Sequence, residues 1–420
     1  MKKIINKIKN ILKNNKTIFE NFTYLGILQF VRIIVPLIML PYLVKVLGIE
    51  TYGIVIFAQA VVFYFMVLVN FGFEMSATKQ ISINRNDVKK LSEIVSAVLT
   101  IKTILFILSG SLYVLLTFAV PKMNDYSLLF LLSYLFCIQE ILIPVWFFQG
   151  IEKMKFITII DVISRATFLI LIFSFVHNKD DYLLIPLLRF IGIIIAGVVS
   201  IYLMFVREKI QLKIVPMEKI IYYFKDSLPF FFSKFTIAIN DRTNTLLIGS
   251  FLGMSSVAYY DFVYKVIGAI NSIFGTFVRA IYPHVAHTKN LIKIKKILYF
   301  NTISSSICYL LLCLFSKKII LLLVGENLLP AQPLFYTLGL LLPLVAIGWS
   351  LGDLNLAANG FNKIYSLSSI HSTIFYLIIV VCLYLFNLIN VNYLIFALLL
   401  RVLFIVIYRY YYCMKYQLIG

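Results

Sequence analysis

Continuous apolar runs of about twenty residues recur along this chain, and they constrain its fold more than any other feature. A helix of about 20 apolar residues crosses the hydrocarbon core of a bilayer. In lipid every backbone polar group must be satisfied internally, so spanning segments form helices or a closed barrel. Barrel strands alternate apolar and polar residues over segments of about ten, and the runs here do not alternate. The sequence therefore predicts an all-α polytopic membrane protein.

Proline, glycine and charged residues between the runs divide the chain into twelve predicted transmembrane helices. They begin near Phe22, Ile54, Ile94, Ser127, Phe156, Tyr182, Leu228, Ser256, Leu298, Pro333, Tyr365 and Asn392. The segment LGIETYG at Leu47 to Gly53 is similar to LGMSSVA at Leu252 to Ala258, and each links the first two helices of its half. We therefore expect two pseudo-symmetric six-helix lobes around a central cavity.

The expected divisions follow the polar segments of the chain. They are a basic cytoplasmic N-terminal segment at 1–20, an N-lobe at 21–206, a cytoplasmic inter-lobe loop at 207–226 and a C-lobe at 227–420. The first of these has isoleucine and leucine at helical spacing and favours a basic amphipathic segment on an anionic leaflet.

The net charge of +20 would suggest nucleic acid as the partner of a soluble protein. Here 61% of the residues are hydrophobic and 13% are charged, so lipid is the main solvent and no nucleic-acid partner is expected. Most lysines and arginines gather in the loops on one side, with Arg409 at the end of the last helix on that side. The positive-inside rule then places both termini in the cytoplasm.

Charged residues also fall within the predicted spans, where each costs at least about 2.5–3.5 kcal/mol unless a partner or water meets it. The basic residues are Arg32, Lys102, Arg165, Arg189, Lys234, Arg242, Lys265, Arg279 and Arg401, and the acidic ones are Glu74, Glu140, Asp161, Asp241, Asp261 and Asp353. The cationic excess favours an anionic ligand. Helical spacing places Gln29, Arg32 and Pro36 on one face of the first helix. It also places Lys234 on the same face as Asp241, and Asp261 on the same face as Lys265.

Several of these charges have a purely structural interpretation as well. The pairs Asp161–Arg165 and Asp261–Lys265 are four residues apart and could neutralise one another within a helix. Glu74 lies near a helix end, where snorkelling to the interface is favoured. In contrast, Arg32 and Lys234 have no acidic neighbour one helical turn away, which favours a place in the cavity for both. Arg242 points about 100° away from Asp241, which leaves pairing with another helix open. The sequence contains no phosphate-binding glycine loop, nucleophile motif or metal-ligand set, so neither an enzyme nor a metal site is predicted.

Several stretches resemble the O-antigen flippase family, the Wzx-type branch of the superfamily that also contains MATE exporters and lipid II flippases. They are PLIMLPYLVKVLGIETYGIVIFAQA (36–60), NFGFEMSATKQIS (70–82), WFFQGIEKMKFIT (146–158), the segment from Asp241 through LLIGSFLGMSSVAYYDFVYKV, and RAIYPHVA (279–286). Among these stretches, the W-FFQG-EKMK segment that begins at Trp146 is the most discriminating. Ala258 departs from the family pattern, because a glycine is common there.

The resemblance implies a transporter of the bacterial inner membrane that moves undecaprenyl-diphosphate-linked oligosaccharide to the periplasmic leaflet for O-antigen or capsule assembly. It implies a cationic cavity between the two lobes. From the charges within the spans we expect alternating access in which Arg32, Lys234, Arg242 and Lys265 engage diphosphate or sugar. Proton or sodium coupling through Asp241, Asp261 or Asp353 is a further expectation, and no other cofactor is expected. Membrane lipids, a polysaccharide polymerase and a chain-length regulator are candidate partners.

Two other functions are compatible with the hydropathy of the chain. A multidrug cation antiporter of the same superfamily would need an acidic or aromatic cavity, whereas this one is predicted to be basic. A membrane polysaccharide polymerase typically carries a large periplasmic loop, and no outward loop here is long enough to fold as a domain.

Overall fold

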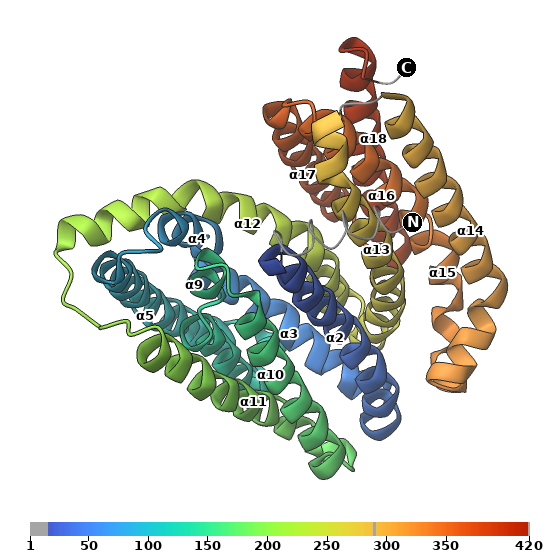
Figure 1. Ribbon diagram of the computed structural model, residues 1–420. Helices are drawn as coiled ribbons and strands as arrows, with labels where there is room; N and C mark the ends of the chain where they lie inside the picture. The colour runs from blue at the N-terminus through green and yellow to red at the C-terminus, as the bar shows by residue number, and fades with distance from the viewer. Residues whose placement is uncertain (1–15, 289–290, 419–420) are drawn as a thin grey trace, which may run out of the picture. The chain divides into compact units, whose positions relative to one another are not determined.

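The computed structural model describes residues 16–288 and 291–418 (Figure 1). These residues form helices without a β-strand, joined by turns and by a longer non-helical segment at 208–216. The helices of the first half are α2 (Lys16–Leu47), α3 (Ile49–Asn70), α4 (Phe73–Ile83), α5 (Val88–Ala119), α6 (Pro121–Asn124), α7 (Ser127–Tyr134), η1 (Leu135–Ile138), α8 (Gln139–Leu142), α9 (Val145–Gly150), α10 (Met154–Phe175), η2 (Lys179–Leu183), α11 (Leu184–Ile201) and η3 (Tyr202–Arg207). Those of the second half are α12 (Met217–Phe251), α13 (Met254–Thr288), α14 (Leu291–Leu323), η4 (Glu326–Ala331), α15 (Gln332–Leu338), α16 (Leu341–Trp349), η5 (Ser350–Ala357), α17 (Asn362–Leu385) and α18 (Val391–Lys415).

Eleven helical segments of the described chain are long and apolar enough to cross a membrane. The helix α12 is not among them, because amide and charged side chains such as Asn240, Asp241 and Arg242 interrupt its apolar sequence. With α12 added, the described residues agree with the dozen helices that the sequence predicts. The prediction of an all-α polytopic protein is therefore confirmed.

Two helix boundaries differ from the prediction. The predicted loop at 207–226 is wrong for its second part, because α12 already begins at Met217 (Figure 1). Its first turns carry Lys219 and Tyr223 toward Glu93 of α5, so the polar residues lie on an amphipathic helix. The predicted fourth helix is interrupted at Pro144, where the chain leaves the helical conformation before α9. Most of the predicted N-terminal segment lies outside the described residues.

The described chain forms two compact units. Unit 1 contains the described residues up to Met39 together with Ala58–Ala238, and unit 2 contains Leu40–Phe57 and the described residues from Ile239 onward. The turn between α2 and α3 therefore belongs to unit 2, while most of both helices belongs to unit 1.

The core of unit 1 is built from two of the stretches that carry the family resemblance. Trp146, Phe147 and Phe148 of α9 are all buried, and α9 packs on α4. The hydroxyl of Thr78 on α4 donates to the Trp146 carbonyl oxygen at 3.1 Å. A Cβ at Gly150 would lie 2.5 Å from a methyl carbon of Ile81, so only glycine permits this approach. These residues act in packing.

The two similar segments at the first turn of each half lie against each other inside unit 2. An ideal Cβ at Gly53 would lie 1.9 Å from the carbonyl oxygen of Met254, so the two backbones touch. Small residues allow such close approach of membrane helices. The turns themselves use glycine in the left-handed region, with φ of 76° at Gly48 and 96° at Gly253. The internal similarity thus marks a direct contact.

Candidate functional site

A cluster of three polar residues holds the predicted ligand-binding Lys265 within unit 2. Lys265 and Asp261 lie one turn apart on α13, and Tyr52 comes from the start of α3. The Lys265 amine donates to Asp261 Oδ2 at 2.7 Å and to the Tyr52 hydroxyl at 2.9 Å, and that hydroxyl donates to Asp261 Oδ2 at 2.6 Å. Tyr52 and Asp261 are buried, while the Lys265 side chain remains 29% exposed. Two buried groups therefore hold the amine in place, while the Lys265 side chain stays partly accessible to a ligand.

In unit 1 the predicted ligand-binding Lys234 has a carboxylate partner on another helix. Its amine lies 2.5 Å from Oε2 of Glu74 on α4, and both side chains are more than one-third exposed. Glu74 therefore pairs within the bundle, where the sequence favoured snorkelling to the interface. The pair is accessible, so an anion could approach Lys234 without unfolding either helix.

Arg32 of α2 belongs to a second charged group in unit 1. Its Nη2 lies 3.4 Å from Asp161 Oδ1 of α10, while Asp161 Oδ2 accepts from Arg165 Nε at 2.7 Å. The intrahelical pair that the sequence suggested does form, and Arg32 adds a second cation to it. Two guanidinium groups thus share one carboxylate, which leaves a net positive charge at this place.

Asp241 and Arg242 of α12 lie with Arg401 of α18 in a third charged group, inside unit 2. Asp241 is exposed, and both arginines are close enough to act on it electrostatically. The Nε of Arg401 is buried and lacks a hydrogen-bond partner among the described residues. Two cations again face one carboxylate, so this group also carries an excess of positive charge.

Asp353 lines a separate cavity of about 440 Å³ in unit 2. It lies in the π-helix η5, a kind of distortion that often occurs at functional sites. Arg279 and Tyr365 line the same cavity, and both Arg279 and Arg409 act on Asp353 electrostatically. The cavity thus combines an acid with a cation, which suits a small polar ligand or an ion.

Exposure distinguishes structural cations from cations that a ligand could reach. The Lys102 side chain is 1% exposed, donates to the Glu140 carbonyl oxygen at 2.8 Å and lies 3.5 Å from its carboxylate. The side chains of Lys265, Lys234 and Arg32 are 29%, 35% and 42% exposed. We therefore take Lys102 as part of the packing and the other three as candidate ligand contacts.

Comparison with known proteins places the chain in a family. Residues 18–289 match the family described as "Polysaccharide biosynthesis protein". The chain belongs to this family. It is 26% identical over 285 residues to a protein of Escherichia coli (strain K12) named "Putative O-antigen transporter", a match that covers 68% of this chain and 69% of that one.

The polysaccharide biosynthesis family member described here also has the fold of solved transporters. It is similar to the structure titled "Lipid II flippase MurJ, inward closed conformation", with a TM-score of 0.77, 14% identity and coverage of 93% of this chain and 87% of that chain. A second similar structure is the outward-facing conformation of a multidrug resistance MATE family transporter of the MOP superfamily. There the TM-score is 0.66 and the identity is 12%, with 96% of each chain covered. The chain is a multi-pass membrane protein.

The seven site residues predicted for this family member fall into several groups. Lys265 and Asp261 share one cluster, Asp241 and Arg242 share another, and Asp353 lines a cavity of its own, all in unit 2. Arg32 and Lys234 belong to different ion pairs of unit 1. Their roles in binding or coupling remain predictions.

Four partners were not among the predicted site residues, namely Tyr52, Glu74, Asp161 and Arg401. Each comes from a helix other than that of its predicted partner, so spacing along one helix could not reveal it. A signal did exist for Tyr52, because it lies in the LGIETYG segment that matches the turn beside Asp261.

Proposed function

We propose that this protein moves undecaprenyl-diphosphate-linked oligosaccharide repeat units across the bacterial inner membrane, for assembly of O-antigen or capsule. Its family, the name of the relative from Escherichia coli and the fold shared with a lipid II flippase support a transporter over an enzyme. Both termini lie in the cytoplasm in this proposal, as the positive-inside rule expects.

The observation that carries the proposal is that several cations within the spans are accessible and each is held by a carboxylate. These are Lys265 with Asp261, Lys234 with Glu74, and Arg32 with Asp161. A diphosphate brings more negative charge and more acceptor oxygens than one carboxylate, so it can replace that carboxylate as the partner of the cation. The cation therefore has an anionic partner both before and after the ligand binds, so its charge is never left uncompensated within the bilayer.

Exchange of partners also provides a route to ion coupling. When diphosphate takes Lys265, Asp261 loses its cationic partner while Tyr52 can still donate to it. A buried carboxylate without a cation favours uptake of a proton or a sodium ion. Asp241 and Asp353, each beside two arginines that a ligand could draw away, are further candidates for ion coupling. Rocking of the two lobes around a central cavity would then give alternating access.

The alternative function is a cation antiporter. Two observations support it, namely the fold shared with a multidrug transporter and the carboxylate in the Asp353 cavity. The surplus of cations around Asp161 and Asp241 argues against an organic cation as cargo. A polysaccharide polymerase and a chain-length regulator are proposed as partners that receive the flipped unit.

The test uses a bacterial strain that lacks its own flippase for the same repeat unit. We would measure the fraction of lipid-linked repeat units in the periplasmic leaflet after expression of the wild-type chain, Lys234→Gln, Lys265→Gln and the control Lys45→Gln. Lys45 is an exposed lysine of α2, so the control removes the same charge elsewhere.

We expect restored flipping with the wild type and Lys45→Gln, and loss with the other two variants at equal protein level. Cells that accumulate unflipped units despite the wild-type protein, but extrude a cationic dye, would indicate the antiporter instead. Normal flipping by both Lys234→Gln and Lys265→Gln would show that these lysines are not the binding groups.

A further inference from the structure

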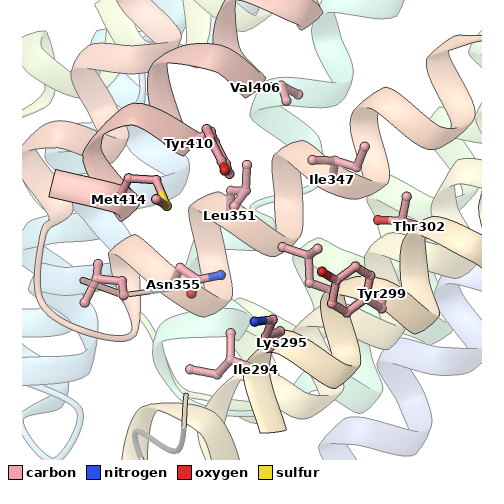
Figure 2. Close-up of a pocket in the computed structure, with 12 residues that line it drawn as sticks. Ile294, Lys295, Tyr299, Thr302, Ile347, Leu351, Asn355, Val406, Tyr410 and Met414 are labelled. Carbon is pink, nitrogen blue, oxygen red and sulfur yellow. The ribbon is translucent and has the colours of Figure 1, made fainter. Parts of the chain in front are cut away.

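A second cavity of unit 2, of about 490 Å³, lies between α14 and α18. Both helices pack on α16 and η5, which form its floor with Ile347, Leu351 and Asn355. One wall comes from α14 between Ile294 and Thr302, and the other from α18 between Val406 and Met414. The lining is mainly aliphatic and aromatic (Figure 2). A volume of this size lies within the range of about 300–1,000 Å³ that is typical of small-molecule sites.

The cavity lies near the ends of two apolar helices, and the length of these helices indicates that such ends reach the lipid head groups. Its wall residues Ile294 and Lys295 lie near the start of α14, which begins at Leu291. On the opposite wall, Met414 is one residue from the end of the span Val391–Lys415. The positive-inside rule assigns this basic end to the cytoplasmic leaflet.

Polar side chains lie along the cavity, with the hydroxyls of Thr302 and Tyr410 apart from Lys295. Lys295 is the only charged residue among the described residues that line it. The Lys295 amine, the Tyr299 hydroxyl and the Asn355 amide surround the same space in Figure 2. An anion with an apolar tail matches this distribution.

The cavity also opens on a surface that faces lipid. Tyr299 and Met414 at its rim are each more than half exposed, and the same helices continue with exposed apolar residues such as Ile303 and Ile407. In a bilayer such a cavity is filled by the acyl chains of neighbouring lipids, and phospholipids are the most abundant of these lipids. We propose that it binds an anionic glycerophospholipid of the cytoplasmic leaflet, with an acyl chain along Leu351 and the phosphate at Lys295.

The site can be tested with a fluorescent reporter in its wall. Tyr299→Trp protein would be reconstituted into vesicles of dioleoylphosphatidylcholine that contain increasing fractions of dibrominated phosphatidylglycerol. Bromine quenches a nearby tryptophan, and quenching beyond that of the protein without the added tryptophan reports occupancy of the cavity. Dibrominated phosphatidylcholine in the same vesicles measures the preference for the anionic head group.

We expect phosphatidylglycerol to quench at a lower lipid fraction than phosphatidylcholine. Adding Lys295→Gln should weaken the phosphatidylglycerol response about fivefold, the change that corresponds to about 1 kcal/mol per lysine near a membrane surface. Lys363→Gln, which removes an exposed lysine at the start of α17, should not change it. Equal helix content by circular dichroism would establish that all variants are folded.

Three outcomes would overturn the proposal. Equal quenching by the two lipids, or an unchanged response with Lys295→Gln, would show that no anionic lipid is selected. Loss of quenching on addition of soluble glycerol phosphate would indicate a site for the head group alone. Loss on addition of an equimolar amount of undecaprenyl phosphate would make the polyprenyl carrier, and not a phospholipid, the occupant.

Discussion

Replacement of Asp261 by asparagine should destabilise the protein, and a second replacement at Lys265 should recover part of the loss. In the wild type, Asp261 Oδ2 accepts from both the Lys265 amine and the Tyr52 hydroxyl, at 2.7 and 2.6 Å. Asparagine removes the negative charge and leaves Lys265 without its counter-ion in a largely apolar setting. Breaking a buried ion pair in this way is more damaging than removing both charges together.

The magnitude follows from two limits. A hydrogen bond to a charged group contributes about 1.5–3 kcal/mol. Side-chain hydrogen bonds inside membrane proteins average about 0.6 kcal/mol and reach about 1.7. Since Asp261 is buried and the Lys265 side chain is 29% exposed, we expect a coupling energy of about 1–2 kcal/mol between the two residues.

A double-mutant cycle measures this coupling. The free energy of unfolding would be determined in mixed micelles for the wild type, Asp261→Asn, Lys265→Gln and the double variant. The effects of unconnected residues add within about 0.3–0.5 kcal/mol. Additivity within that margin would therefore refute the ion pair. If Lys265 also binds diphosphate, the double variant should be stable yet inactive in flipping, which separates the two roles of this lysine.

Two further predictions concern packing in unit 2. Gly53→Ala should lower the free energy of unfolding by more than about 4 kcal/mol, because the added Cβ would lie 1.9 Å from the Met254 carbonyl oxygen. Gly253→Ala, at φ 96° with open space around it, should lower it by about 1–3 kcal/mol. Thermal unfolding of both variants tests this, and equal losses would contradict the close contact. Asn244→Leu should lower the free energy of unfolding by about 1–3 kcal/mol, because the Tyr376 hydroxyl donates to Asn244 Oδ1 at 2.5 Å and would lose this acceptor. Adding Tyr376→Phe should restore part of that stability in the same assay.

Much of this fold could be predicted because the length of an apolar run is set by the thickness of the bilayer. The start of α12 at Met217 could not, because the polar residues that precede Leu228 mark where the apolar run begins and do not end the helix. The break at Pro144 was equally hidden, since the apolar run continues through it. Hydropathy reports the solvent of a segment, and backbone geometry is a separate property.

The site was predictable only as far as one helix is concerned. Spacing of four residues identified the contact between Asp261 and Lys265, because one turn of helix brings such residues together. It could not supply Glu74 as the partner of Lys234, which required the packing of α4 on α12. Arg409 shows the same limit: it was assigned to a helix end, but it is buried and donates to the Gly348 carbonyl oxygen at 2.6 Å.

The pairing of accessible cations with carboxylates has a consequence for selectivity under the proposed function. Phospholipid phosphates surround the protein, and Lys234 would bind them if Glu74 did not already pair with it. With Glu74 at 2.5 Å, a phosphodiester of one negative charge offers Lys234 no more than the carboxylate already does. A diphosphate exceeds it in charge and in acceptor oxygens. The carboxylate thus raises the threshold for ligands, and specificity arises from what the site already holds as much as from what it attracts.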